Sequence, residues 1–423
     1  MSTRFDIDRE VTDWLVSERP TAAPDGLIDA VAAGVAATPR RRGWQIADRW
    51  TWRHQARLRV VARVAAVAAV LAALIVALAW ALAFVGSRRP APPFGLTRAG
   101  FIAFDTAQGI VVDTADGKAR KVLLAADGQS ISPTWSRDGL HLAYWHRAGR
   151  SAPWSLIVVE PDGTSPSVVA DGIRLREREA DLSQPSNIAW SPDSRRIAYA
   201  ADVGEDHSLF VATLGQTGAE RITDPSLKAI DPAWRPDGSV IAFQSEKTDT
   251  LHVVAPDGSH EHQFATLAHT LFWPDWSPDG SSIATMAFVP DPGDPNTGQT
   301  DIFTIAGDGA IVTDVSRDPA DEYSPTWSPD GSRLAWDRVP TDGSARAYLV
   351  VARNGGPNVI EIRIPADLAP PTWSPDGTRI FSYVMGSNGA FHELVVIDPD
   401  GVAPIVRLPA TGNTGNGNWQ RLP

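Results

Sequence analysis

Two hydrophobic patterns divide the chain. Residues 64–85 are an unbroken apolar run, whereas the residues beyond them alternate short apolar runs with turn-forming clusters. At about 1.5 Å per residue, the run spans a hydrocarbon core of roughly 30 Å and predicts a transmembrane helix. Ala81-Leu82-Ala83 resembles a signal-peptide cleavage site, but the long segment before the run, residues 1–63, favours an uncleaved anchor.

A repeat of about 45 residues accounts for the second pattern. Each copy carries a tryptophan, a turn related to Ser-Pro-Asp-Gly and a short β-prone run such as Ile241-Ala-Phe243. A second apolar run follows in each copy, so each copy has at least two strands and room for four. The repeated tryptophans are Trp135, Trp190, Trp234, Trp276, Trp327 and Trp373, with Trp419 at the same spacing. The repeated turn aspartates are Asp138, Asp193, Asp237, Asp279, Asp330 and Asp376.

The repeated turn has a physical explanation. Proline fixes the negative φ that the first central position needs, aspartate accepts a hydrogen bond from a backbone N–H ahead of it, and glycine tolerates positive φ. The tryptophan before the turn can bury a large apolar area, which stabilises each module by roughly 4 to 6 kcal/mol. A single four-stranded sheet cannot bury both of its faces, so these modules are expected to stack radially.

The modules predict an all-β propeller over residues 96–423, with seven blades as the first choice and six as the alternative. The first module, around Phe101-Ile-Ala-Phe104, lacks a leading turn of its own, and the segment around Trp419 lacks a following strand. These two halves complement each other. We therefore expect the C-terminal strand to close the ring beside the strands near residues 101–113.

The residues before the propeller divide into three predicted segments. Residues 1–63 form a cytoplasmic segment with amphipathic helices at 5–18 and 25–37, residues 64–85 span the membrane, and residues 86–95 are a proline-rich linker. Arginines cluster before the span, which places the N-terminus in the cytoplasm and the propeller outside it. The Arg40-Arg41-Arg42 run suits an anionic lipid surface.

Composition and charge exclude several kinds of chemistry for this chain. The chain has no cysteine, which excludes disulfides, thiolate zinc sites and a cysteine nucleophile, and it has 16 tryptophans, which the repeat explains. Residues 91–423 carry 17 more acidic than basic side chains. Such a domain repels phosphate backbones, so nucleic acid is not an expected partner.

The Trp-Ser-Pro-Asp-Gly turn followed by Ile-Ala-Phe resembles the TolB-like, WD40-like (PD40) propeller repeats. The resemblance extends over the whole repeat region, residues 96–423, and implies a propeller. TolB-type proteins work with an envelope complex but have a six-bladed propeller behind an α/β domain. Prolyl-oligopeptidase-like enzymes carry similar repeats, yet this sequence has no Gly-x-Ser-x-Gly elbow. In layout the chain is similar to single-pass anti-sigma factors, although it lacks their His-x-x-x-Cys-x-x-Cys motif.

Two other clusters have simpler explanations than a metal site. His260-Glu-His262 has ligand spacing without an evident third ligand. The Asp291-Pro-Gly-Asp294 loop lacks the acid series of a calcium loop. We therefore predict no catalytic, cofactor-binding or metal-ligating residues.

The resulting functional hypothesis is a membrane-anchored, extracytoplasmic propeller that binds protein, peptide or glycan and is not an enzyme. The alternatives are an anti-sigma-like regulator, in which residues 1–60 bind a sigma factor, and an envelope scaffold of TolB type. The membrane lipid is a partner through residues 64–85. Loops carry binding in such folds, and the expected candidates are residues 145–154, 171–186, 289–300 and 337–346.

Overall fold

The computed structural model describes residues 95–125, 127–175, 188–265, 270–316, 319–341, 347–354, 359–364, 367–368, 370–385, 391–409 and 417–423. The chain divides into two units, Met1–Val85 and Gly86–Pro423. The expected cytoplasmic helices, membrane span and most of the linker lie outside the described residues. Within these ranges no helix is long and apolar enough to cross a membrane.

Seven antiparallel sheets make up the described part of the second unit, and we number them as blades 1 to 7 in chain order. Blade 1 is β29 (Gly417–Leu422), β1 (Arg98–Thr106), β2 (Gly109–Asp113) and β3 (Lys121–Ala125); blade 2 is β4 (Gln129–Trp135), β5 (Leu142–Arg147), β6 (Trp154–Val159) and β7 (Ser167–Ile173). Blade 3 is β8 (Ile188–Trp190), β9 (Arg196–Val203), β10 (Asp206–Thr213) and β11 (Ala219–Arg221); blade 4 is β12 (Ala229–Trp234), β13 (Ile241–Ser245), β14 (Thr250–Val254) and β15 (His262–Gln263).

The remaining three sheets follow the same plan. Blade 5 is β16 (Thr270–Trp276), β17 (Ser282–Asp291), β18 (Asp294–Ala306) and β19 (Val312–Asp314); blade 6 is β20 (Asp321–Trp327), β21 (Arg333–Val339), β22 (Tyr348–Arg353) and β23 (Val359–Arg363). Blade 7 is β24 (Asp367–Leu368), β25 (Thr372–Trp373), β26 (Ile380–Met385), β27 (Phe391–Ile397) and β28 (Val406–Pro409), with β24 and β25 both paired to β26. The one helical element among the described residues is a 3₁₀ turn, η1 (Pro225–Leu227).

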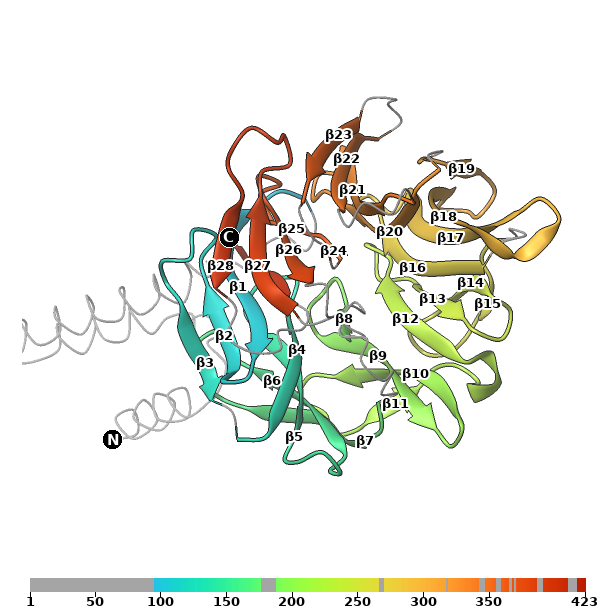
Figure 1. Ribbon diagram of the computed structural model, residues 1–423. Coiled ribbons are helices and arrows are strands. Elements are labelled where there is room, and N and C mark those ends of the chain that lie inside the picture. The colour runs from blue at the N-terminus through green and yellow to red at the C-terminus, as the bar shows by residue number, and fades with distance from the viewer. Residues whose placement is uncertain are drawn as a thin grey trace, which may run out of the picture. The chain divides into compact units, whose positions relative to one another are not determined.

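The blades follow one another around a ring (Figure 1). Contacts join the first strand of each blade to that of the next through β29, β4, β8, β12, β16, β20 and β25, and β25 meets β29 to close the circle. C-terminal β29 pairs with β1, with Trp419 opposite Ile102. The prediction of a seven-bladed, all-β propeller closed by its C-terminal strand is therefore confirmed, and the six-bladed alternative is wrong.

The strand nearest the axis carries a repeated irregularity just before its tryptophan. In four blades the register shifts there, and the residue three positions before the tryptophan has positive φ: Ser132, Asp231, Trp273 and Ser324. A proline follows it in each case, as Pro133 does before Trp135. Proline fits here because an inner strand is an edge strand, and one side of its backbone faces the channel instead of a neighbour.

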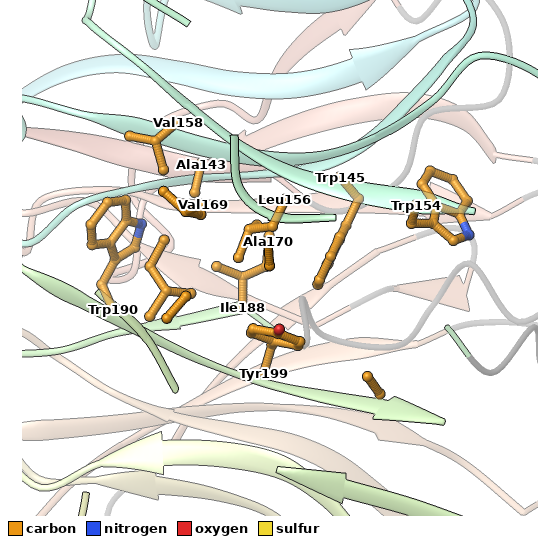
Figure 2. Packing of buried hydrophobic residues seen from close by; sticks show 13 residues of the cluster. Ala143, Trp145, Trp154, Leu156, Val158, Val169, Ala170, Ile188, Trp190 and Tyr199 are labelled. Atoms are coloured by element: carbon orange, nitrogen blue, oxygen red, sulfur yellow. The ribbon is translucent and has the colours of Figure 1, made fainter. Parts of the chain in front are cut away.

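Apolar side chains fill the junctions between neighbouring blades. The described residues form seven clusters, one for each junction of the ring. Between blades 2 and 3, the rings of Trp145 and Tyr199 meet edge to face, with centroids 5.2 Å apart, and Trp190 lies at the other side of the same cluster (Figure 2). Burial of the repeat tryptophans at these junctions holds the stacked sheets together.

One expected loop is a pair of strands instead. Residues 289–300 continue β17 to Asp291 and begin β18 at Asp294, with Pro292 and Gly293 forming the tip. Gly293 has a φ of +98°, which suits the third position of a proline-led turn. The expectation of a loop over these residues was wrong because this local turn chemistry extends the hairpin.

Candidate ligand pocket at one end of the channel

A cavity of about 310 Å³ lies where the seven inner strands end. All seven blades line it, each through its repeat tryptophan and the residue just before that tryptophan. The cavity is therefore a product of ring closure, because no single blade or pair of blades encloses it. We call it the axial pocket.

The turn after each tryptophan also reaches the axial pocket. The second residue after the tryptophan is proline in five blades, and Pro278, Pro329 and Pro375 line the pocket from this position. In the other two blades the same position holds arginine: Arg137 in blade 2 and Arg421 in blade 1. These blades are neighbours in the ring.

Among the described residues that line the pocket, three are charged: Arg137, Arg421 and Asp275. Asp275 stands just before its tryptophan in blade 5, three blades from Arg137 and therefore across the ring. Its Oδ2 accepts a hydrogen bond of 2.8 Å from the backbone N–H of Trp327. The Nη2 of Arg421 donates one of 2.6 Å to the carbonyl of Gly95. With all three groups ionised, the lining carries one excess positive charge.

The enclosed position of these groups alters their protonation. Burial raises the pKa of Asp275 to about 6, although the Trp327 N–H and the Arg137 charge act in the opposite direction. Burial lowers the pKa of Arg137, which the Asp275 charge partly offsets. Burial and then the Arg137 charge lower the pKa of Arg421 to about 10. Arginine keeps its charge at neutral pH, and the Arg137 charge acts unfavourably on that of Arg421.

Indole hydrogen bonds join some blades around the pocket and not others. Trp190, Trp234, Trp373 and Trp419 each donate from Nε1 to a carbonyl of the preceding blade, over 2.9 to 3.1 Å. The buried Nε1 atoms of Trp135, Trp276 and Trp327 have no acceptor among the described residues. The junctions without this bond are 1/2, 4/5 and 5/6. They adjoin the blades that carry Arg421, Arg137 and Asp275.

Comparison with known proteins supports the architecture. Residues 96–284 match the PD40 family, described as a TolB beta propeller domain. The Tol-Pal system protein TolB of Francisella tularensis is 25% identical over 266 residues, which cover 58% of this chain and 57% of that protein. Together with the seven-bladed ring, this decides the kind of domain. The described part of the chain is a TolB-like β-propeller.

Solved structures share the fold of this TolB-like propeller. An oligogalacturonate lyase in complex with manganese superposes with a TM-score of 0.54 at 14% identity, covering 75% of this chain and 86% of the lyase. A puromycin-hydrolyzing peptidase of Mycobacterium tuberculosis gives the same TM-score and identity, covering 76% of this chain and 55% of the peptidase. At this identity, the likeness concerns the fold alone.

The structure brings the seven repeat tryptophans together around the axial pocket, and each has at most 6% of its surface exposed. The repeat aspartates act inside their own turns. Asp279 accepts a 2.6 Å bond from the Ser277 hydroxyl and a 3.0 Å bond from the Ser281 backbone N–H, and these bonds lower its pKa. The other five aspartates accept the equivalent backbone bond two residues ahead.

The histidine cluster of the TolB-like propeller has local partners. His262 Nδ1 lies 2.8 Å from the carbonyl oxygen of His260, and Glu261 Oε1 lies 2.6 Å from His252 Nδ1. In the part of the chain that the structure describes, no group of three His, Asp or Glu side chains is placed to hold a metal ion. The other proposed binding loops extend into residues outside the described ranges, except 145–154, which joins β5 to β6.

Sequence reasoning missed Arg137, Arg421 and Asp275. Arg137 and Arg421 interrupt a repeated proline, and Asp275 is the only acidic residue among the seven that precede a repeat tryptophan. An alignment of the repeat copies with one another would have shown this departure. Its meaning depends on the ring, which brings residues from blades 1, 2 and 5 into one cavity.

Proposed function

We propose that this chain is a membrane-anchored, extracytoplasmic binding protein of the cell envelope, and that its propeller takes a protein or peptide segment into the axial pocket. The observation that carries the proposal is the charged lining itself. Charges are costly to enclose, and three of them replace the small or apolar residues that the repeat places there in the other blades. Charged residues at these positions are better explained by recognition of a ligand than by a role in folding.

The relatives support a binding role in the envelope. Several are named Tol-Pal system protein TolB, which places those proteins in an assembly. This chain spans 57% of their length, so its own partners are part of the proposal. The peptidase and lyase among the structural neighbours share the fold, while the axial pocket has no histidine and one carboxylate in its described lining. Binding without turnover therefore suits the pocket better than catalysis.

A scaffold of TolB type is the second candidate, and the similarity to TolB favours it. The anti-sigma-like alternative depends on residues 1–60, which lie outside the described residues. Both alternatives share the anchored layout and differ in which part of the chain meets its partner. A single capture experiment separates them.

The capture experiment uses full-length protein solubilised from membranes, a chain without residues 1–60, and full-length Arg137→Pro. We expect full-length protein and the truncated chain to retain the same envelope partner, and Arg137→Pro to lose it. A sigma factor bound only by full-length protein would replace the proposal with the regulatory alternative. Equal capture by all three chains would favour a scaffold that uses another surface.

The absence of cysteine allows a direct test of the anchored layout. Val402 is 86% exposed on the propeller, so Val402→Cys should react in intact cells with a maleimide that cannot cross membranes. The Ser2→Cys variant should react only after the cells are opened. Equal protection of both variants in intact cells, or release of the protein without detergent, would contradict the proposed anchoring.

A further inference from the structure

A second cavity lies away from the channel, between blades 6 and 7. Its volume is about 420 Å³, within the range of small-ligand sites. Strands β21, β22 and β23 of blade 6 supply most of its lining, and Asp400, in the turn between β27 and β28 of blade 7, also lines it. We call it the rim pocket. It shares no lining residue with the axial pocket, so its chemistry is a separate question.

The rim pocket contains a pair of like charges that the sheet does not require. Arg333 of β21 lies directly opposite Arg353 of β22 in the antiparallel register, and both line the pocket. Side chains in this relation have Cβ atoms roughly 4.5 to 5.5 Å apart, and like charges there destabilise the strand pairing. In blade 7 the equivalent positions hold Arg379 and Asp398, which have opposite charges. A blade therefore forms without an arginine at the position of Arg353.

Contacts with blade 7 explain Arg333 but not Arg353. Arg333 donates from Nη1 to Asp400 Oδ1 over 3.0 Å and from Nη2 to the carbonyl of Gly377 over 2.9 Å. Its guanidinium carbon also lies 4.8 Å from the centroid of the Trp373 ring. Arg353 is exposed and has no hydrogen bond, ion pair or ring contact with another described residue. Arg333 thus joins two blades, whereas Arg353 has no such role in the described structure.

Charge in the described lining of the rim pocket does not balance. Arg333 and Asp400 pair with each other, which leaves the guanidinium of Arg353. The chain between Asn354 and Val359 is Gly-Gly-Pro-Asn and contains no acidic side chain. The rim pocket is therefore suited to a ligand with a single negative charge.

An apolar wall stands beside this charge. Val351 lies two residues before Arg353 on β22 and so faces the same side of the sheet, and Ile360 of β23 lies opposite Val351. Both line the pocket, and Ile360 is 38% exposed. Val402, two residues after Asp400, is 86% exposed, more than any other large apolar side chain among the described residues. A single exposed arginine is ordinary, but an arginine beside uncovered aliphatic side chains in one cavity favours a ligand with both properties.

The two properties together select a carboxylate on an aliphatic group. A guanidinium presents its N–H donors in a planar fork, which matches the two oxygens of a carboxylate. An inorganic phosphate would leave the aliphatic wall uncovered, and an uncharged ligand would leave Arg353 without an anion. We propose that the rim pocket binds a carboxylate carried by a short aliphatic group, with Arg353 holding the carboxylate and Val351 and Ile360 contacting the aliphatic part. The aliphatic C-terminal residue of a peptide and a free aliphatic acid both have this chemistry.

The test measures dissociation constants of the purified full-length chain by titration calorimetry. The probes are N-acetyl-Ala-Leu with a free carboxylate, its amide, 4-methylpentanoate and inorganic phosphate. We expect the peptide acid to bind about tenfold more tightly than its amide, and 4-methylpentanoate about tenfold more tightly than phosphate. Equal binding of the peptide acid and its amide would overturn the inference, and so would phosphate binding as tightly as the carboxylates. Tighter binding of the peptide acid than of 4-methylpentanoate assigns the site to a C-terminal residue, and the reverse assigns it to a free acid.

Variants locate the effect in the rim pocket. Arg353→Gln should weaken binding of the peptide acid about tenfold, with thermal unfolding unchanged, because it removes the charge without removing a partner in the described structure. Ile360→Thr keeps a β-branched residue on β23 and should weaken binding about threefold while the preference for acid over amide persists. Arg363→Gln removes an exposed arginine from the same strand and is the matched control, which should bind as the unaltered chain does.

The capture experiment separates this inference from the proposed function. If Arg353→Gln loses the peptide acid but retains the envelope partner, the rim pocket is a ligand site distinct from the partner's. If Arg353→Gln loses both, the rim pocket is a carboxylate site that the partner itself uses, and the role proposed for the axial pocket fails. Unchanged binding of the peptide acid by Arg353→Gln would overturn the inference whatever happens to the partner.

Discussion

Two regions of the propeller enclose arginine, and they do so in different ways. In blade 6, Arg338 donates from Nε to Glu322 Oε1 over 2.7 Å and from Nη1 to Glu361, inside a sheet where Glu322 is fully buried. In the axial pocket, Arg137 and Arg421 share one carboxylate, beside a cavity. The first arginine meets its anions within its own blade, whereas the other two line a cavity to which all seven blades contribute. Stability should therefore depend on Arg338, and recognition on Arg137.

The largest expected effect is the loss of the blade 6 ion pair. Arg338→Ala would leave the Glu322 carboxylate buried without its cation, which should lower the free energy of unfolding by about 3 to 5 kcal/mol. Urea unfolding followed by tryptophan fluorescence measures it. The double variant Arg338→Met with Glu322→Gln is the control and should lose much less. A loss below about 1 kcal/mol for Arg338→Ala would remove the contrast between the regions.

The next effect concerns the neighbouring Asp337. Burial, with the Glu322 charge in addition, raises the pKa of Asp337 to about 8. The folded state thus holds this proton more tightly than the unfolded chain does. The resulting stability is complete below about pH 4 and is lost as the pH rises through about 8. At pH 9, the free energy of unfolding of Asp337→Asn should exceed that of the unaltered chain by roughly 1 to 3 kcal/mol, and this advantage should shrink as the pH falls to 5.

The same comparison at pH 9 and pH 5 needs a control for general alkaline effects. Asp308→Asn is suitable because Asp308 lies in an exposed turn of blade 5. An equal gain at pH 9 from Asp308→Asn would show that the buried position of Asp337 is not the cause.

The smallest expected effect is on stability when Arg137 is replaced. Arg137→Pro should change the free energy of unfolding by less than about 1 kcal/mol, because proline fits the turn and restricts the unfolded chain. Exposed Arg221→Ala should stay within about 0.5 kcal/mol. If Arg137→Pro lost several kcal/mol of unfolding free energy, Arg137 would be a structural residue like Arg338. The contrast between the two regions would then fail.

Much of the fold could be predicted from the sequence because its signals are local. The Ser-Pro-Asp-Gly turns, the tryptophans before them and the β-prone runs after them each act over a few residues, and their repetition predicts the blades. Even ring closure followed from the incomplete modules around Phe101 and Trp419, which meet in the pairing of β1 with β29. Residues 289–300 were misjudged because a short Pro292-Gly293 turn outweighed the length of the insertion.

The sequence by itself determined most of the strands and the turns and favoured seven blades over six, because backbone preference and apolar periodicity are properties of neighbouring residues. Only the tertiary structure decided that Arg137, Asp275 and Arg421 share a cavity, since they lie far apart along the chain, in blades 2, 5 and 1. It also decided that the buried Arg338 pairs with the buried Glu322 and with the partly exposed Glu361. Electrostatic effects depend on distance and burial, and both are set when seven blades close into a ring.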